Sequence, residues 1–259
     1  MPLLDVRSLS KSFARGSAGR PAVDDVSFVV GEAETLALVG ESGAGKSTTG
    51  RLVLRLADAD SGEVSFRGTD VRRLRGAALR SFRRDAQMIF QDPFSSLNPR
   101  MRIWKSVAEP LLVHGLCRRK ELKDRAAALL DSVGLGAHLL DRYPTSLSGG
   151  QLQRAAIARA LTTDPALIVC DEPVAALDVS VQAQVINLLL DIQDDRRVAY
   201  LFITHDLALV ERFAHSIAVM REGRVVEHAA TEALFSDPQH DYTRALFSAI
   251  PDMRETAIG

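Results

Sequence analysis

A glycine-rich segment near the N-terminus has the residue types and spacing of a phosphate-binding loop. Residues 40–47 read Gly-Glu-Ser-Gly-Ala-Gly-Lys-Ser and fit the pattern G-x-x-x-x-G-K-[ST]. Glycines let successive backbone N–H groups turn toward a phosphate chain, and a helix that starts here adds the positive end of its dipole. Lys46 can reach terminal phosphates, and the Ser47 hydroxyl can coordinate Mg²⁺. The residues expected to contact a nucleotide are Gly40, Glu41, Ser42, Gly43, Ala44, Gly45, Lys46, Ser47 and Thr48.

A second group of functional residues follows an apolar run later in the chain. Residues 167–170 read Leu-Ile-Val-Cys, as in a strand buried on both faces, and they lead into Asp171 and Glu172. Such a strand would bring Asp171 to a Mg²⁺ ion through a bridging water. It would bring Glu172 beside the terminal phosphate, as a general base or a water-orienting group. Many strands end in a solvated carboxylate, but together with a phosphate-binding loop this pair indicates nucleotide hydrolysis.

The loop alone indicates the broad class of P-loop NTPases, and a further motif narrows it. Residues 147–151 read Leu-Ser-Gly-Gly-Gln and resemble the signature motif of ATP-binding cassette (ABC) proteins. A serine and glycine amides at the start of a helix can form a second anion cradle. The resemblance implies that this cradle binds the nucleotide of the opposite subunit in a head-to-tail dimer. The residues implied to act in trans are Ser148, Gly149, Gly150, Gln151 and Asp178, the last of which matches the D-loop that crosses the dimer interface.

Other landmarks of this family occur in its usual order along the chain. Gln91 matches the Q-loop glutamine, which approaches the metal and the attacking water. His205 matches the switch histidine at the terminal phosphate, and Phe13 matches the aromatic residue that stacks on adenine. The resemblance therefore implies an ATPase that uses ATP and Mg²⁺. Its implied catalytic residues are Lys46, Gln91, Glu172 and His205, and its implied metal ligands are Ser47, Gln91 and Asp171.

Three longer segments, residues 90–101, 178–184 and 241–251, resemble ATPases of peptide, opine and nickel importers. Among these the chain is similar to the second ATPase of a pair. Such importers usually combine two different ATPases with two transmembrane permeases and an extracytoplasmic solute-binding protein. The resemblance implies solute import, with permease contact over Asp92–Trp104, and leaves a homodimer or a heterodimer open. An exporter ATPase is an alternative, because the same cassette serves both directions.

Two non-transport classes of ABC ATPase fit the chain less well. ATPases that act on DNA carry a coiled coil or a zinc module between the Q-loop and the signature motif. In this chain the corresponding interval, from Gln91 to Leu147, is short and lacks heptads and metal-binding cysteines. Ribosome-associated members normally carry two cassettes, and this chain carries one. A formal net charge of −1 gives no electrostatic case for nucleic acid as a partner. The basic stretch from Arg72 to Arg84 is expected to be a solvated face, with nucleic acid or lipid head groups as the alternative.

Alternating strands and helices must position these residues. Apolar runs predict strands at 3–9, 26–30, 34–39, 166–170, 199–203 and 217–220, a hairpin at 62–68, and helices at 46–56, 77–84, 118–133, 151–161, 181–193 and 242–250. This order predicts an α/β fold with a mostly parallel sheet covered on both faces and a functional loop at the carboxyl ends of its strands. The resemblance adds a RecA-like core, a small antiparallel β subdomain and an inserted helical subdomain. We expect one nucleotide-binding domain over 1–259, with the core and β subdomain at 1–91 and 165–230, the helical subdomain at 92–164 and a helical tail at 231–259.

Composition supports a globular protein without disulfides. The chain has 259 residues, of which 46% are apolar, enough for a sizeable core. Cys117 and Cys170 lack metal-ligand spacing, so we expect no disulfide framework, zinc site or iron–sulfur centre, and we expect Cys170 to be a buried small hydrophobe. No signal peptide or membrane span is apparent. We therefore expect a cytoplasmic protein, peripheral on the inner face of a bacterial cell membrane.

Overall fold

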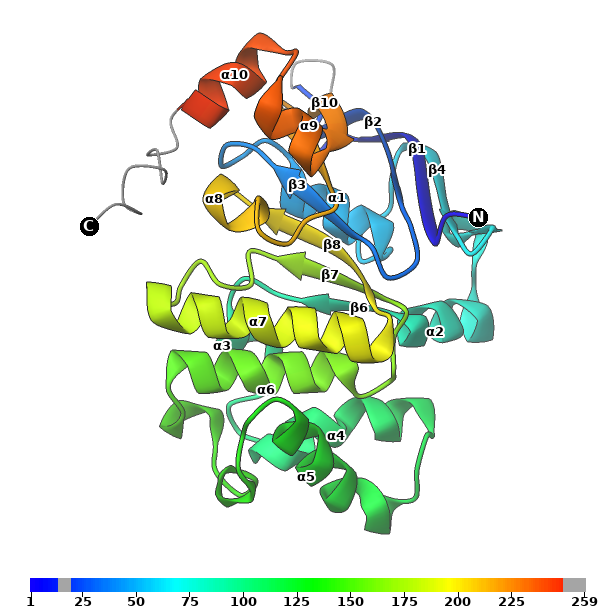
Figure 1. Cartoon of the computed structure of the whole chain (residues 1–259). Coiled ribbons are helices and arrows are strands. Elements are labelled where there is room, and N and C mark those ends of the chain that lie inside the picture. Colours follow the sequence, from blue (N-terminus) through cyan, green and yellow to red (C-terminus); the bar gives the residue numbers. More distant parts are fainter. Residues whose placement is uncertain (14–19, 249–259) are drawn as a thin grey trace, which may run out of the picture.

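The chain folds into two β-sheets with helices packed against them (Figure 1). The computed structural model describes residues 1–13 and 20–248. The smaller sheet is antiparallel and has the order β2-β1-β4-β5, with β1 at Leu4–Lys11, β2 at Val23–Val30, β4 at Ser61–Phe66 and β5 at Thr69–Asp70. The larger sheet has the order β10-β9-β3-β8-β7-β6, with β3 at Thr35–Val39, β6 at Ala86–Ile89, β7 at Leu167–Asp171, β8 at Ala199–Thr204, β9 at Ser216–Arg221 and β10 at Arg224–Ala230. The predicted α/β class with a mostly parallel sheet is confirmed, and among the described strands of this sheet only the edge strand β10 pairs antiparallel.

The central strands are buried on both faces, as their continuous apolar runs predict. All residues of β3, β7 and β8 are buried. Alternate residues of β7 enter different cores: Ile168 and Cys170 pack with the cluster around the inserted helices, whereas Leu167 and Val169 pack with the cluster under the antiparallel sheet. Cys170 is therefore a buried apolar residue, as predicted.

Helices cover both faces of the larger sheet. Those of the α/β part are α1 (Lys46–Val53), α2 (Gly76–Asp85), α7 (Val179–Arg196), α8 (Leu207–Val210), α9 (Thr231–Ser236) and α10 (Asp241–Ser248), with a 3-10 turn η1 (Val71–Arg73). At Gly50 of α1 an added Cβ would come within 3 Å of the side chains of Ile203 and Val169, so this helix lies close against β8 and β7. Figure 1 shows α9 and α10 together at the end of the molecule opposite to the inserted helices.

A helical insertion connects β6 to β7. It contains α3 (Pro93–Ser96), α4 (Ile103–His114), α5 (Leu122–Ser132) and α6 (Gly149–Leu161), with 3-10 turns η2 (Arg119–Glu121), η3 (Ala137–Leu139) and η4 (Pro144–Ser146). The prediction of one helix over 118–133 was wrong at its start, and α4 was missed because Pro110 lies inside it. A proline removes one i→i−4 hydrogen bond, but burial of Ile103, Val107 and Leu111 on one face of α4 outweighs this loss.

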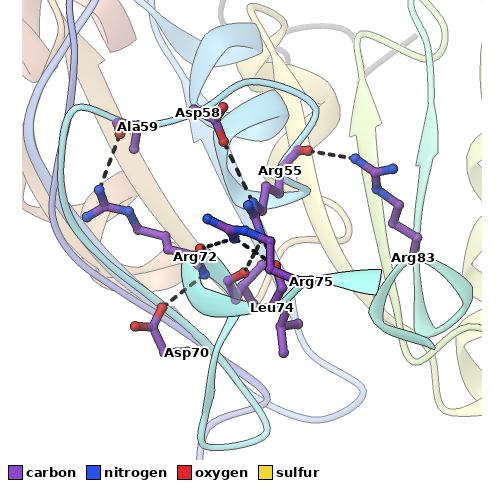
Figure 2. Close-up of polar contacts among 9 residues, drawn as sticks. Arg55, Asp58, Ala59, Asp70, Arg72, Leu74, Arg75 and Arg83 are labelled. Carbon is purple, nitrogen blue, oxygen red and sulfur yellow. Dashed lines mark hydrogen bonds and ion pairs between the residues drawn. The ribbon is translucent and has the colours of Figure 1, made fainter. Parts of the chain in front are cut away.

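The basic stretch is part of the scaffold rather than only a solvated face, as Figure 2 shows. Arg72 donates to the carbonyl oxygens of Gly62 and Ala59. The guanidinium of Arg75 donates to the carbonyls of Arg72 and Leu74 at 2.9 and 2.8 Å, and that of Arg83 donates to the carbonyl of Arg55 at 3.1 Å. Arg75 and Arg83 are exposed, as expected of a solvated face, whereas Arg72 is half-buried and bonded to main-chain carbonyls.

Within the described ranges 1–13 and 20–248, no helix is both long enough and apolar enough to cross a lipid bilayer.

Candidate functional site

The glycine-rich loop lies between β3 and α1, at one edge of the larger sheet. Gly40 has φ +146° and Gly45 has φ +104°, backbone conformations that favour glycine. Both also lie too close to neighbouring main chain for a side chain: a Cβ on Gly40 would collide with the carbonyl oxygen of Met220, and one on Gly45 with that of Ala22. The loop therefore needs glycine at these positions to reach the N-terminus of α1, where free N–H groups and the helix dipole can receive an anion.

Lys46, the first residue of α1, turns back over this loop. Its side chain is buried, and Nζ donates to the carbonyl oxygens of Gly40 at 2.7 Å and Glu41 at 2.9 Å. Burial lowers the pKa of Lys46, whereas the negative charges of Glu172 and Asp171 act in the opposite direction. A cation is thus held at the mouth of the loop by carbonyl oxygens that a phosphate can replace.

Two oxygen ligands suited to a hard cation meet beside the loop. The Ser47 hydroxyl donates to Oδ1 of Asp171 at 2.6 Å, although the two residues are far apart in sequence. Asp171, at the end of β7, is 2% exposed. Burial raises its pKa, and the hydrogen bond from Ser47 opposes that rise. Mg²⁺ prefers such oxygen ligands and usually takes only one or two carboxylates, with water and phosphate completing its shell, so these residues fit that ion.

Glu172 carries a feature that no sequence motif reveals. Its φ is +46°, an unfavourable value for a non-glycine residue, and its N–H donates to the carbonyl of Ile203 at 2.9 Å. The carboxylate is shared between two partners: Oε2 accepts from Nε2 of Gln91 at 3.0 Å, and Oε1 lies 3.3 Å from Nδ1 of His205. The two flanking strands β6 and β8 therefore deliver the residues that orient this carboxylate.

Sheet register explains why these side chains meet. In the parallel pairs Val39 is opposite Thr204, Ile89 is opposite Cys170, and Asp171 is opposite Ile203. The segments that follow β3, β6, β7 and β8 consequently leave the sheet at the same edge. A cavity of about 560 Å³ opens there, lined by Ala22, Gly40, Glu41, Ser42, Gly43, Gly45, Lys46, Ser47, Thr48, Gln91, Glu172, His205 and Leu246.

Most of the predicted nucleotide contacts line this cavity, and two lie just behind it. Ala44 has a buried side chain, and its N–H donates to the carbonyl of Glu41 at 3.2 Å within the loop. Asp171 reaches the cavity through its bond to Ser47. No sequence signal identified Ala22, which precedes β2, or Leu246 of α10, because neither belongs to a motif of phosphate chemistry.

The residues predicted to act in trans are not among those that line the cavity. Ser148 and Gln151 form a reciprocal cap at the start of α6, in which the N–H of Gln151 donates to Ser148 Oγ and the N–H of Ser148 donates to Gln151 Oε1. Asp178 caps α7 by accepting from the N–H of Val181. Phe13 is 65% exposed and is also absent from the cavity wall. The nucleotide roles of these residues remain predictions.

Comparison with known proteins gives this site a family context. A family model described as ABC transporter matches residues 23–175. The chain is 53% identical to the glutathione import ATP-binding protein GsiA of Pectobacterium atrosepticum over 89% of its own length, and 50% identical to GsiA of Escherichia coli (strain K12) over 96%. It spans only 37% and 41% of the lengths of these two relatives.

Solved structures with the same fold include two ATP-binding cassettes. One is the dimeric post-hydrolysis state of the ATP-binding cassette MJ0796 bound to ADP and Pi, with a TM-score of 0.79, 28% identity and coverage of 88% of this chain and 98% of that one. The other is cbiO1 from Clostridium perfringens, described as part of the ABC transporter complex cbiONQ, with a TM-score of 0.80, 26% identity and 91% coverage of both chains.

Proposed function

The chain belongs to the ABC transporter family, and on that premise we propose that it is an ATP-hydrolysing subunit that powers solute import through a membrane permease. One observation carries this proposal: the phosphate-binding loop, the Ser47–Asp171 pair and Glu172 with its two partners converge at a single cavity. A nucleoside triphosphate is the ligand that needs an anion cradle, a cation site and a carboxylate close to one another.

In the proposed binding mode, the phosphate chain occupies the loop from Gly40 to Thr48. Backbone N–H groups and Lys46 neutralise the phosphates, and Lys46 exchanges its carbonyl partners for phosphate oxygens. Ser47, Asp171 and Gln91 are the residues that would hold Mg²⁺, which when bound supplies charge neutralisation between phosphate oxygens. Phe13 is proposed to stack on the adenine.

Hydrolysis is proposed to depend on Glu172. Its carboxylate is fixed by Gln91 and His205, so it is positioned to accept a proton from a water molecule or to orient that water for attack on the terminal phosphate. His205 and Gln91 then contact the phosphate and the water, while Lys46 stabilises the charge that develops on the phosphoryl oxygens. Each role requires the tertiary arrangement at the edge of the sheet.

The complete site is proposed to form between two subunits. The N–H groups of Gly149 and Gly150 lie in the first turn of α6, where amides have no acceptor within the helix, and they would bind the nucleotide of the opposite subunit, together with Ser148, Gln151 and Asp178. The dimeric MJ0796 structure supports this arrangement, because it has the same fold. ATP would thus close a head-to-tail dimer, and its hydrolysis would allow the dimer to reopen.

The names of the relatives support import of a peptide-class solute such as glutathione, and the sequence segments leave nickel and opine classes as alternatives. The proposed partners are two permeases, a second ATPase and an extracytoplasmic solute-binding protein, which would place the chain at the inner face of a bacterial membrane. Within the chain we propose that residues 92–164 form the subdomain that contacts the permease near Asp92–Trp104. Exposure of Phe94 there supports this contact.

Replacing Glu172 by glutamine tests the catalytic assignment. We expect the rate of ATP hydrolysis at saturating ATP to fall about 100-fold or more, because positioned general bases contribute roughly 10²–10⁴-fold. Nucleotide binding should be retained, since the amide preserves the size of the side chain. The matched control is Glu211→Gln at an exposed position outside the cavity. An unchanged rate in Glu172→Gln would exclude this residue as the base, and a wild-type chain that binds no ATP would refute the proposed function.

A further inference from the structure

The C-terminal segment around Tyr242 is conspicuous in the sequence but has no part in the chemistry described above. In the structure it forms α10, which lies beside α9 and β10 (Figure 1). Tyr242 is 9% exposed and belongs to an apolar cluster with Val39 of β3 and Val219 of β9. The helix is therefore anchored on the strands that border the phosphate-binding loop.

Tyr242 makes a direct polar contact with that loop. The N–H of Glu41 donates to Oη of Tyr242 at 3.3 Å. One helical turn later, Leu246 lines the cavity, so two residues on the same face of α10 approach the nucleotide site. The guanidinium of Arg221 lies 4.8 Å from the centroid of the Tyr242 ring, a cation–π contact that fixes the ring beside the loop.

The start of α10 is held in place independently of the loop. The carboxylate of Glu227 on β10 accepts from the N–H groups of Gln239 at 2.7 Å and His240 at 3.0 Å. Nδ1 of His240 in turn accepts from the N–H of Tyr242 at 3.1 Å. Because Tyr242 is positioned by bonds that do not involve the loop, it can act as a fixed support for Glu41.

The bond to Tyr242 matters because Glu41 also binds Lys46, through its carbonyl oxygen. Nζ of Lys46 holds the carbonyls of Gly40 and Glu41. On the proposed function, a phosphate in the loop would compete for the same ammonium group and would weaken these carbonyl contacts. The bond from the Glu41 N–H to Tyr242 does not involve the lysine and can persist.

We propose that Tyr242 is a positioning residue of the nucleotide site, which holds Glu41 so that the phosphate-binding loop keeps its anion-binding conformation when Lys46 turns to the phosphates. This role rests on the proposed function. It assigns part of the nucleotide affinity to a helix far from every nucleotide motif in the sequence. It also predicts that the contribution appears in binding rather than in the rate of the chemical step.

The test is Tyr242→Phe in the full chain, which keeps the ring on Arg221 and removes only the hydroxyl. Binding of MgATP is measured by isothermal titration calorimetry in the Glu172→Gln background, and steady-state hydrolysis is measured in the wild-type background. We expect roughly three- to tenfold weaker MgATP binding, the effect of losing one hydrogen bond. The hydrolysis rate at saturating ATP should change by less than about twofold, because Tyr242 touches no reacting group.

Tyr200→Phe is the matched control. Its buried hydroxyl likewise makes one hydrogen bond to the main chain, donating to the carbonyl of Leu189 at 3.0 Å, but Tyr200 is not part of the cavity wall. Thermal unfolding of both variants reports any loss of stability. Nucleotide affinity should fall in Tyr242→Phe and stay at the wild-type value in Tyr200→Phe.

Three results would overturn the proposal. They are an unchanged affinity in Tyr242→Phe, an equal loss of affinity in both variants, and a loss confined to the hydrolysis rate. A wild-type chain that does not bind ATP would instead refute the proposed function itself, so the two failures are distinguishable.

Discussion

At the scale of single residues, the geometry of Glu172 indicates how the site is prepared for reaction. A non-glycine residue in the left-handed region costs roughly 1–3 kcal/mol, and such strain is found where the surroundings enforce it. Here the N–H of Glu172 is held by the carbonyl of Ile203, and its carboxylate is held by Gln91 and His205. On the proposed function, this fixed orientation of the side chain would reduce the reorganisation needed during hydrolysis.

The pair formed by Ser47 and Asp171 leads to a prediction about metal dependence. In Ser47→Ala, the Mg²⁺ concentration that gives half-maximal hydrolysis should rise about tenfold or more, because even outer partners of metal ligands contribute on that scale. Ser47→Thr keeps the hydroxyl and should remain near the wild-type value. Titration of Mg²⁺ at fixed ATP checks both variants. Equal Mg²⁺ dependence in Ser47→Ala and the wild type would remove Ser47 from the set of metal ligands.

At the scale of secondary structure, arginine side chains connect α1 to the elements that precede β6. Arg55, just after α1, donates to the carbonyls of Val71, the first residue of η1, and of Leu74, which follows η1. Its own carbonyl accepts from Arg83 of α2 (Figure 2). The helix that carries Lys46 is thereby tied to the helix that leads toward Gln91. A guanidinium serves this purpose because its several donors can bind two carbonyls at once.

Removal of these donors should destabilise the fold. We expect Arg55→Met to lower the free energy of unfolding by about 1.5–3 kcal/mol, since hydrogen bonds to charged groups contribute on this scale and methionine retains the apolar stem. The control is Arg80→Met on the exposed side of α2, for which a change within about 0.5 kcal/mol is expected. Urea denaturation measures both. Equal effects in the two variants would show that the carbonyl contacts of Arg55 do not contribute.

At the scale of the whole molecule, the two segments proposed to bind nucleotide lie in separate places. The phosphate-binding loop lines the cavity, whereas the loop at Ser148 begins α6 and is not part of the cavity wall. The position of the Ser148 loop outside the cavity is explained if the first amides of α6 bind the nucleotide of a second subunit. The fold shared with the dimeric MJ0796 cassette supports the same interpretation.

This arrangement predicts dimers that depend on ATP. For Glu172→Gln with ATP, light scattering coupled to size-exclusion chromatography should give a molar mass twice that of the monomer, because hydrolysis no longer reopens the dimer. Adding Ser148→Arg should return the mass to that of a monomer, since a long cation at the start of α6 blocks the partner's nucleotide. The same double variant should still bind ATP through its own loop. A dimer that persists with Ser148→Arg would contradict the head-to-tail arrangement, and a chain that stays monomeric throughout would indicate that the second ATPase is required.

Local sequence was sufficient for the central strands and for the chemistry at their ends. The runs before Gly40 and Asp171 predicted buried strands that the structure confirms, because a continuous apolar run needs burial on both faces. The phosphate-binding loop was predictable because positive φ values favour glycine locally, whereas the close approach of the Met220 and Ala22 carbonyls to Gly40 and Gly45 is a tertiary contact that the motif does not reveal. The helix α4 and the edge strand β10 were not predicted, because Pro110 and a half-exposed strand give weak local signals that packing overrides.

The sequence by itself determined the chemical groups of the site and the strands that precede Gly40, Asp171 and His205, but it did not predict β6, the strand that precedes Gln91. Only the tertiary structure decided which groups meet: the register of β6, β7 and β8 brings Gln91, Glu172 and His205 together, and the packing of α10 brings Tyr242 to Glu41. The physical reason is range. Loop conformation and helix starts depend on a few neighbouring residues, whereas strand pairing and helix docking depend on apolar burial between segments that are distant in the chain.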